Sequence, residues 1–469
     1  SEKQLQNILI IINHGLSSRY ILRSSLINNL ITFSKMNIII AVDDPSTFSY
    51  LVSQFKERIT IVQSPNIVNG LSKKEKIYRY IKLIQSFGMP DEKKYNAIWV
   101  KKNLFTKHAN YSSIKKIFVL LCSRIHCNFQ LFRKILRYIT YHITIDSRFT
   151  DILKQKKIDK VMLDGLTSVW TNNSYWVSAS KHLGINTTTL ITNWDHPTTR
   201  GYESINAKEY LVWGKSMRDE IIKYHDIEPH KVNIKGSIIF DMYSDSSFIL
   251  SNNKIKSIYN TIIPDKYVLF LTHSPYYPYN FELIKYIRKQ LQDDMALIVR
   301  LHPLYLDDFA KSELEKHKKY DKANSNVIYF YPNSSNNSLA ADMSYGEIQL
   351  SASLVANALV MINCMSTMLL DGLISNKKVI NIAFDWRKRI SHPMPLSIAE
   401  YRLHLSRVIN APGSHLVRTR NELSVQLSDL INQNYESKNS SIIDEIILKE
   451  CGVIDGSVAI NIANHLIKS

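Results

Sequence analysis

The sequence predicts an α/β protein with two Rossmann-like domains facing a cleft, and three observations support this fold class. Short apolar runs alternate with longer amphipathic segments along the whole chain. Most of the short runs are apolar throughout, which is typical of parallel strands covered by helices on both faces. At 469 residues the chain is too long for one ordinary hydrophobic core, so we expect two domains of roughly 200 residues each.

The candidate strands are short runs rich in Ile, Val, Leu and Thr. Helix-length segments separate them, and this alternation favours parallel sheets with right-handed crossovers. We expect strands at 7–13, 37–42, 58–62, 160–165, 187–192, 210–214 and 232–236 in the first domain, and at 267–272, 296–302, 327–331, 359–364 and 378–384 in the second.

The domain boundary is expected between 242 and 262, where the sequence is polar and poor in strand formers. This gives a first Rossmann-like domain at 1–241, expected to bind the acceptor, and a second at 262–469, expected to bind a nucleotide donor. The stretch 420–469 has a helical pattern, and its last helices are expected to cross back to the first domain.

The charge is strongly basic, with 59 Lys and Arg against 41 Asp and Glu and a formal net charge of +18. Nucleic acid, an anionic membrane or acidic small molecules would each suit such a charge. Residues 93–145 contain eleven Lys or Arg and no Asp or Glu, and they interleave these cations with large apolar residues. This basic amphipathic segment is either a surface for anionic phospholipid or a lipid-linked acceptor, or a core helix with a solvated basic face.

Two further function classes follow from the charge. A nucleic-acid-binding protein is less favoured than the enzyme, because no RRM, KH, zinc or helix-turn-helix signature occurs and the cations concentrate in one segment, so we expect no nucleic-acid partner. A catalytically inactive scaffold that binds lipid through 93–145 is the other.

The expected compartment is the cytoplasm. The four cysteines show no CxxC spacing and no paired framework, which is typical of thiols in a reducing environment. No run of 18 apolar residues occurs, so a membrane would be met only at its surface, peripherally on the inner face of the cytoplasmic membrane.

A phosphate site is expected in the second domain, where the apolar run 296–302 ends in Arg-Leu-His-Pro. Ligands of open parallel sheets bind at the carboxyl ends of strands. Arg300 and His302 would lie on the same side of this strand, because side chains alternate. A cation and an imidazole together suit phosphate oxygens. The alternative is an ordinary capped strand end.

A second part of this site is expected at Ser366 and Thr367, where a strand passes into a helix within 359–385. Hydroxyls and free N–H groups at a helix start bind anions, although Ser and Thr also serve as ordinary caps. The pair complements Arg300 and His302 within one domain.

The third part is the loop after the strand at 267–272, with Thr272, His273 and Ser274. The first such loop of a Rossmann-like domain is the expected place for a phosphate or for closure against the other domain. Neither GxGxxG nor GxxxxGK[ST] occurs, so the sequence lacks the dinucleotide and P-loop signatures.

The His-Pro and Ser-Thr pairs resemble the motifs of bacterial sialyltransferases, Kdo (3-deoxy-manno-octulosonic acid) transferases and CDP-glycerol glycerophosphotransferases. These are GT-B enzymes of surface-polysaccharide synthesis. The resemblance implies that His302, Ser366 and Thr367 contact the donor's phosphate and nucleotide. It extends over 190–469 and includes 192–201, 212–241 and 452–466.

The function implied by the resemblance is a glycosyltransferase. It would move a sugar from a nucleotide donor, CMP-Kdo or another CMP-ulosonate, to a glycan or lipid-linked acceptor of lipopolysaccharide, capsule or O-antigen. The alternative is a UDP-sugar-dependent glycosyltransferase, or a UDP-sugar epimerase of the same fold.

Two carboxylates are candidates for the catalytic base that an inverting transfer needs. Asp164, followed by Gly165, resembles the acidic-residue-then-Gly motif of the sialyltransferases, although Leu163 replaces its first acidic residue. We expect Asp164 to be the base and Asp195 to position the acceptor or shape the cleft. The reverse assignment stays open, and so does an ordinary turn or cap role for each. No DxD at a strand end, HExxH or Cys/His cluster occurs, so we expect no metal and no cofactor, with the leaving phosphate neutralised by Arg, His and helix N-termini.

Overall fold

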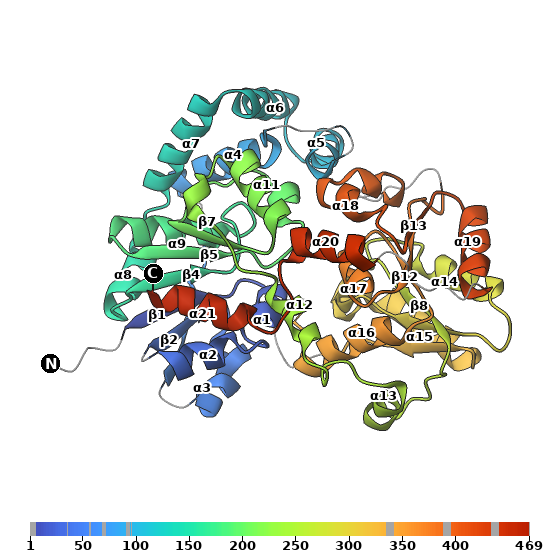
Figure 1. The fold of residues 1–469 in the computed structure, drawn as a ribbon. Helices are drawn as coiled ribbons and strands as arrows, with labels where there is room; N and C mark the ends of the chain where they lie inside the picture. Colours follow the sequence, from blue (N-terminus) through green and yellow to red (C-terminus); the bar gives the residue numbers. More distant parts are fainter. Residues whose placement is uncertain are drawn as a thin grey trace. The chain divides into compact units, whose positions relative to one another are not determined.

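A computed structural model describes residues 6–34, 36–55, 58–67, 72–90, 94, 96–333, 342–387, 395–432 and 440–468 (Figure 1). The described chain forms two compact units. The first contains the residues up to Asp241 and those from Glu450 onward, and the second contains those between Met242 and Lys449. Each unit is built on a fully parallel sheet.

The first unit has a seven-stranded sheet in the order β3-β2-β1-β4-β5-β6-β7. Its central strands are almost fully buried, as expected for apolar runs covered on both faces. The strands are β1 (Asn7–Ile11), β2 (Asn37–Val42), β3 (Ile59–Gln63), β4 (Lys160–Leu163), β5 (Asn186–Leu190), β6 (Glu209–Val212) and β7 (Val232–Ile234).

Helices connect these strands, and side chains of the preceding loops cap several of them. A capping box starts α4, in which the Ser72 amide donates to Glu75 and the Glu75 amide donates to Ser72. The helices are α1 (Gly15–Ile21), α2 (Leu26–Phe33), α3 (Ser49–Phe55), α4 (Lys73–Phe87), α5 (Ala97–His108), α6 (Ser113–Asn128), α7 (Gln130–Ile143), α8 (Ser147–Gln155), α9 (Thr171–His182), α10 (His196–Thr199), α11 (Lys215–His225), α12 (Ile238–Asp241) and α21 (Val458–Lys468).

The last helix, α21, belongs to the first unit and lies beside α2 (Figure 1). The Asp241 carboxylate accepts hydrogen bonds from the backbone N–H groups of Gly456 and Val458, at 2.7 and 2.8 Å. Glu450 accepts from the Trp194 indole at 2.8 Å and from the Ser216 hydroxyl at 2.6 Å. These charge-assisted bonds fasten the end of the chain to residues more than 200 positions earlier.

The second unit has a six-stranded sheet in the order β10-β9-β8-β11-β12-β13. Its strands are β8 (Tyr267–Leu271), β9 (Ala296–Arg300), β10 (Val327–Phe330), β11 (Val360–Asn363), β12 (Lys378–Ile382) and β13 (Ser414–Val417). Its helices are α13 (Asn252–Tyr259), α14 (Asn280–Gln290), α15 (Lys311–Ala323), α16 (Tyr345–Asn357), α17 (Met368–Ile374), α18 (Leu403–Val408), α19 (Arg420–Asn432) and α20 (Ser440–Cys451), whose last two residues group with the first unit.

Two features of this unit were not expected. The sequence did not predict β13, a four-residue edge strand containing Ser and His, because it lacks a long apolar run. Residues 242–261, left between the predicted domains, group with the second unit. The Leu250 amide donates to the Ser353 hydroxyl, and the Asn357 side chain donates to the Leu250 carbonyl.

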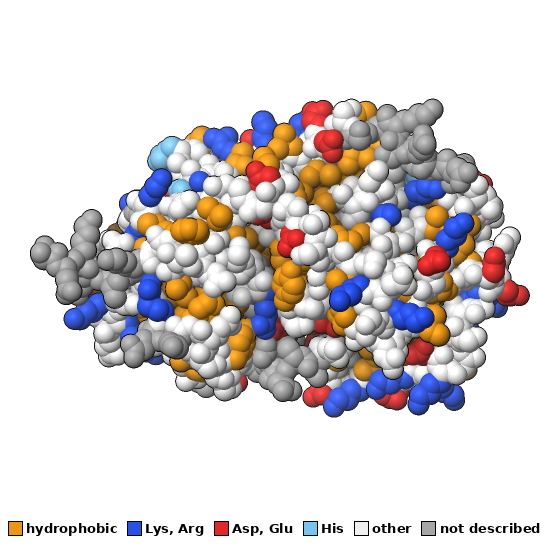
Figure 2. Space-filling view, turned by 60° about the horizontal axis from the view of Figure 1, so that its bottom comes forward, with side chains coloured by type: hydrophobic (Ala, Val, Ile, Leu, Met, Phe, Trp, Pro, Cys, Tyr) orange, Lys and Arg blue, Asp and Glu red, His pale blue; other side chains and the backbone are white. Residues whose placement is uncertain are grey.

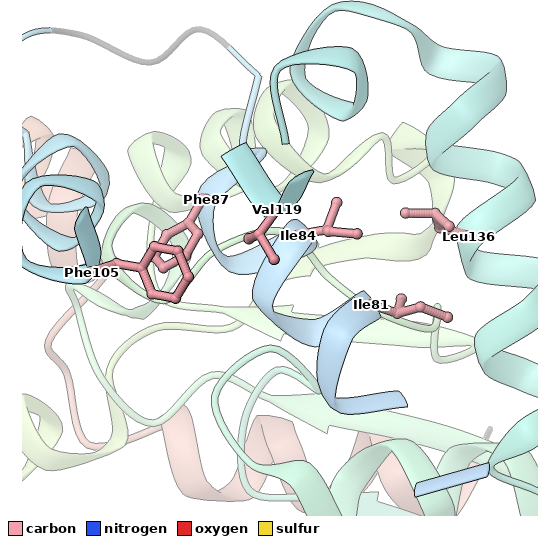
Figure 3. Packing of buried hydrophobic residues seen from close by; sticks show 6 residues of the cluster. All are labelled: Ile81, Ile84, Phe87, Phe105, Val119 and Leu136. Atoms are coloured by element: carbon pink, nitrogen blue, oxygen red, sulfur yellow. The ribbon is translucent and has the colours of Figure 1, made fainter. Parts of the chain in front are cut away.

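A separate hydrophobic cluster joins four helices of the first unit (Figure 3). One face of α4 supplies its centre, and one buried side chain from each of α5, α6 and α7 packs against it, with further partly buried side chains of α6 and α7 around them. Its buried members are Ile81, Ile84, Phe87, Phe105, Val119 and Leu136. This cluster therefore anchors one face each of α6 and α7 to the domain.

The basic residues are dispersed over the face of the molecule that Figure 2 shows. Lys and Arg side chains are distributed across the face shown in Figure 2 and do not gather there in one patch. Among the helices described, none is both long and apolar enough to cross a membrane.

Candidate functional site

Each sheet has a switch point, where the chain connections run in opposite directions from two adjacent strands. In the first unit this point lies between β1 and β4, and in the second between β8 and β11. Ligands of open α/β sheets bind outside the carboxyl ends of the strands at such points. The residues predicted from sequence lie at both points or in the adjoining loops.

Asp164 follows β4 and is fully buried. Its Oδ2 accepts from the Asn13 backbone N–H and its Oδ1 from the Asn13 side chain, both at 2.6 Å, and the Asn173 amide donates to Oδ1 at 3.3 Å. Burial raises the pKa of Asp164, and the hydrogen bonds from Asn13, Ser17 and Asn173 oppose this rise. Both oxygens are thus used to hold the ends of β1 and β4 together, so the contacts favour a positioning role over the predicted role as base.

The next residue, Gly165, has a φ of +142°, which a residue with a side chain rarely adopts. A Cβ there would lie 3.3 Å from Trp170 Nε1. The Trp170 indole stacks on His14, with ring centroids 5.3 Å apart, and meets His196 edge-on at 6.2 Å. Three rings from three loops therefore meet at the carboxyl edge of this sheet.

Both histidines of this group are neutral at physiological pH. Burial, with help from Arg19 and Arg200, lowers the pKa of His14 to about 4. Burial also lowers the pKa of His196 to about 4, although Asp195 opposes the shift. A neutral imidazole can accept a proton at one nitrogen and donate a hydrogen bond from the other.

His196 is buried, and neither ring nitrogen has a hydrogen-bond partner among the residues described. Its neighbour Asp195 is half-buried and accepts from the Thr199 hydroxyl at 2.9 Å. Lys101 donates to the Thr199 carbonyl at 2.6 Å, and burial, with Arg200 nearby, lowers the pKa of Lys101 to about 8. Of the two predicted carboxylates, Asp195 is the one with solvent access and titratable neighbours.

A pocket of about 650 Å³ lies in the first unit, between the loops after β2 and β3 and the helices α4 and α9. It contains Lys82, whose ammonium group donates to the Thr167 carbonyl and the Thr171 hydroxyl at 3.1 and 2.9 Å. Burial lowers the pKa of Lys82 to about 7, and the nearby Glu203 opposes the shift. The remaining lining is mixed polar and aromatic: Asp43, Gln63, Ser64, Asn66, Ile67, Glu75, Tyr78, Arg79, Leu83, Ser86, Tyr111, Asn172 and Tyr175.

In the second unit, the loop after β8 is held by Asn280. Its side chain accepts from the His273 backbone N–H at 3.0 Å and donates to the carbonyls of His273, Ser274 and Tyr277. The Ser274 hydroxyl lies 3.1 Å from His273 Nδ1. The predicted residues of this loop therefore sit on a rigid turn.

Thr272 joins this loop to the one after β9, because its hydroxyl accepts from the His302 backbone N–H at 3.0 Å. His302 caps a short 3₁₀ helix (Pro303–Leu306), and its Nδ1 accepts from the Leu304 backbone N–H at 3.2 Å. In the neutral ring this places the proton on Nε2, which becomes a hydrogen-bond donor. His302 is half-buried.

Ser366 and Thr367 follow β11, after Met365 in the left-handed conformation at φ 53°. The Ser366 hydroxyl donates to Asn363 at 2.6 Å and accepts from the Met368 backbone N–H at 3.3 Å. Both residues are half-buried. Across the β8/β11 switch point, the His273 backbone hydrogen-bonds the Cys364 thiol, whose pKa burial raises to about 12.

Arg300 does not project freely from the sheet edge as expected. It is buried and forms an ion pair with the equally buried Glu347 on α16. Its guanidinium also donates to the Ser351 hydroxyl at 3.3 Å and to the Tyr331 carbonyl at 2.9 Å. The physical reason is that a buried cation needs an anionic partner, which Glu347 supplies. A phosphate role for Arg300 stays a prediction, and these contacts favour a structural one.

Several residues of these edges were not found from sequence. Asn13 and Asn280 have no signature, because one amide side chain becomes a loop clamp only through the fold. In the sequence, Lys82 looks like an ordinary cation on the exposed side of a helix. Glu347 had a signal, since Ser344 and Glu347 have the spacing of a capping box, and the Glu347 amide does donate to the Ser344 hydroxyl. Among the residues described, no three His, Cys, Asp or Glu side chains form a cluster that could hold a metal ion.

No protein-family model matches the chain, and no curated protein matches it. Several solved structures, in contrast, have a similar fold. A UDP-GlcNAc 2-epimerase from Methanocaldococcus jannaschii is 12% identical with a TM-score of 0.51, over 99% of this chain and 100% of that one. A glycosyltransferase from Rickettsia africae is 10% identical with a TM-score of 0.50, over 100% of both chains. Another UDP-N-acetylglucosamine 2-epimerase is 10% identical with a TM-score of 0.51, over 99% and 96%.

At this level of identity the likeness establishes the fold. The chain has two Rossmann-like domains of the GT-B kind, which confirms the fold class expected from the sequence.

Proposed function

We propose that this protein is a glycosyltransferase that uses a UDP-sugar as donor and a glycan or lipid-linked acceptor. The observation that carries the proposal is the presence of two separate candidate binding regions. The β8/β11 edge of the second unit presents hydroxyl and imidazole groups suited to a diphosphate, and the first unit holds its own pocket of about 650 Å³. A transferase needs room for two substrates.

We favour a uridine nucleotide as the donor over the cytidine nucleotide that the sequence motifs imply. Two of the solved structures of similar fold are UDP-N-acetylglucosamine 2-epimerases, which act on a uridine nucleotide sugar. CMP-Kdo or another CMP-ulosonate remains a second donor class, which the same experiments test. A role in lipopolysaccharide, capsule or O-antigen synthesis goes with this second donor class.

Within this proposal, His302, Ser366 and Thr367 bind the donor phosphates, supported by the loop of Thr272, His273 and Ser274. The His302 Nε2–H would donate to a phosphate oxygen, and the hydroxyls would do the same. Their rigid loops reduce the loss of side-chain entropy on binding. The leaving phosphate is stabilised by these donors without a metal ion.

In the first unit, we assign the base to Asp195 and a positioning role to Asp164, the reverse of the first expectation. Asp195 has solvent access, whereas both oxygens of the buried Asp164 are occupied. The Lys82 amine, with a pKa of about 7, would bind an anionic or hydroxyl-rich acceptor in the pocket.

A UDP-sugar 2-epimerase is the second candidate, supported by the buried His196 imidazole, whose nitrogens have no hydrogen-bond partner among the described residues and which could move a proton at a sugar carbon. Product analysis separates the two functions. Incubation with UDP-GlcNAc alone should leave the sugar's C2 configuration unchanged, and addition of a suitable acceptor should release UDP. Formation of the C2 epimer without acceptor would replace the proposed function with the epimerase.

A further inference from the structure

The exposed sides of α6 and α7 carry an unusual set of large apolar residues. We call this set the α6–α7 face. Each member is at least 43% exposed, and Ile114 reaches 81%. Exposed apolar residues grouped along one side of a helix mark an interaction site more often than scattered single residues do. The face consists of Ile114, Ile117, Phe118, Leu121, Ile125, Phe129, Leu131, Ile135 and Tyr138.

This face is not needed to pack the helices. Val119 on α6 and Leu136 on α7 point into the buried cluster around α4, as Figure 3 shows. On the exposed side, residues 114, 118, 121 and 125 of α6 recur at helical spacing, and residues 131, 135 and 138 of α7 repeat the pattern. Both helices therefore have two apolar sides, and only one of them is used by the fold.

The charge of the region divides into structural and exposed cations. Arg133 pairs with Asp226 at 2.6 Å, and Arg137 donates to the His225 carbonyl at 2.7 Å, so these two hold α7 in place. Lys115, Arg124 and Lys134 are exposed, and the exposed Glu228 carboxylate attracts Lys134.

The acid-free segment 93–145 covers α5, α6 and α7 completely, and only its residues 93 and 95 lie outside the described chain. The α6–α7 face thus combines exposed apolar side chains with exposed cations, and segment 93–145 itself contributes no carboxylate that would repel an anion.

We propose that the α6–α7 face docks on the surface of an anionic phospholipid bilayer. Helices lying in a membrane interface bury Phe, Leu and Ile at the boundary with the acyl chains, and their Lys and Arg contact the headgroups. Phe118 and Leu131 supply the apolar part, and Lys115 and Arg124 supply the charge.

A second copy of the chain fits this face less well. An isologous contact would bring the same patch of each copy together, so the exposed cations Lys115, Arg124 and Lys134 of one copy would meet a patch of the same charge. Like charges across an interface oppose association. Charge complementarity therefore selects an anionic surface.

Docking would also serve the proposed transfer. Tyr111, just before α6, lines the pocket of the first unit, and α4 contributes one side to that pocket and another to the cluster that anchors α6 and α7. If the proposed function holds, a lipid-linked acceptor in the membrane would lie near the pocket entrance. The docking itself needs neither nucleotide nor turnover.

Vesicle sedimentation tests the docking. The purified full-length chain is mixed with vesicles of phosphatidylcholine alone, or of phosphatidylcholine containing one-third phosphatidylglycerol, at low and high salt. We expect binding to the anionic vesicles only, weakened by salt. Phe118→Ser with Leu131→Ser should weaken it at least about tenfold, because two apolar side chains no longer insert. Lys115→Gln with Arg124→Gln should weaken it roughly tenfold as well.

Matched controls lie on the second unit. Ile258→Ser with Ile262→Ser removes side chains that are 52% and 72% exposed, comparable to 56% for Phe118 and 71% for Leu131. Lys254→Gln with Lys256→Gln removes two exposed cations of α13. Both control variants should bind like the wild type. Absence of binding, equal binding to neutral vesicles, or equal loss in the controls would overturn the proposal. The proposal would also fail if the protein did not bind vesicles but formed a dimer that Phe118→Ser with Leu131→Ser dissociates.

Discussion

Asp164 and Asp195 follow neighbouring strands of the first sheet but differ in their surroundings. Asp164 is fully buried and accepts hydrogen bonds at both oxygens, whereas Asp195 is half-buried and bonds the Thr199 hydroxyl. A base must reach the proton that it removes, and a carboxylate saturated by internal donors cannot do so without breaking them. The hydrogen bonds around each carboxylate therefore favour Asp195 over Asp164 as the proposed base, although both residues follow a strand.

Substitution of each carboxylate by its amide separates their roles. Asp195→Asn should lower kcat by roughly 100-fold or more with little change in thermal stability, because it removes a base. Asp164→Asn should chiefly destabilise the first unit, because an amide cannot accept at both positions from Asn13. Steady-state kinetics and thermal unfolding measure both effects. A large loss of kcat with unchanged melting temperature in Asp164→Asn would restore the first assignment.

Arg300 and Glu347 form the buried ion pair of the second unit. Arg300→Ala should destabilise the protein by about 3–5 kcal/mol, because Glu347 would remain buried without a counter-charge. Lys316→Ala, which breaks an exposed pair with Glu313, should cost about 1 kcal/mol or less. Urea unfolding measures both. Similar small changes in the two variants, with loss of nucleotide binding in Arg300→Ala, would show that Arg300 is a phosphate ligand after all.

At the scale of elements, the end of the chain is held by a carboxylate distant in sequence. Asp241, the last residue of α12, accepts from the first N–H group of α21 and from Gly456. The α21 helix buries Ile462 and Leu466 in the first unit. A helix N-terminus favours a negative charge, so Asp241 acts as the cap of a helix to which it is not adjacent in sequence.

Loss of this cap should loosen α21. Asp241→Asn should lower the free energy of unfolding by about 1–2 kcal/mol and increase hydrogen exchange in 456–468. Asp245→Asn, which changes an exposed carboxylate bonded only locally to Ser247, is the matched control and should have little effect. Unchanged exchange in Asp241→Asn would show that apolar packing alone holds α21.

Elements with a strong pattern were predictable from the sequence, and those that depend on contacts were not. The apolar run 267–272 contains β8 because its hydrophobic residues suffice to specify a buried strand. The edge strand β13 depends on pairing with β12, which no local pattern encodes. The same holds at the site. Ser366 and Thr367 were placed at a strand-to-helix turn from sequence, but the pairing of Arg300 with Glu347 arises from residues 47 positions apart.

At the scale of the whole molecule, buried neutral histidines link stability to pH. Burial is the main cause in each case, and it lowers the pKa to about 4 for His14, His126, His196, His225 and His317. In the unfolded chain these groups titrate near 6.5. Their contribution to stability is therefore complete above pH 6.5 and is lost as the pH falls toward 4, where the unfolded chain binds more protons.

We expect each such histidine to contribute to a fall in stability between pH 6.5 and pH 4, with a slope of at most about 1.4 kcal/mol per pH unit. His225 is the best single probe, because its ring accepts from the Glu203 amide and lies 2.7 Å from the Pro197 carbonyl. His225→Gln should reduce the slope of stability against pH, whereas His230→Gln, at an exposed site, should not. Identical slopes in His225→Gln and the wild type would contradict this.

The most direct test of the proposed function is calorimetric titration with UDP. The wild type should bind UDP more tightly than CMP, and His302→Ala and Ser366→Ala should each weaken UDP binding by about tenfold, because each removes a hydrogen bond to a charged phosphate. Ser406→Ala, an exposed serine of the same unit, should bind like the wild type. Absence of UDP binding, or unchanged affinity in both His302→Ala and Ser366→Ala, would contradict the donor site at the β8/β11 edge.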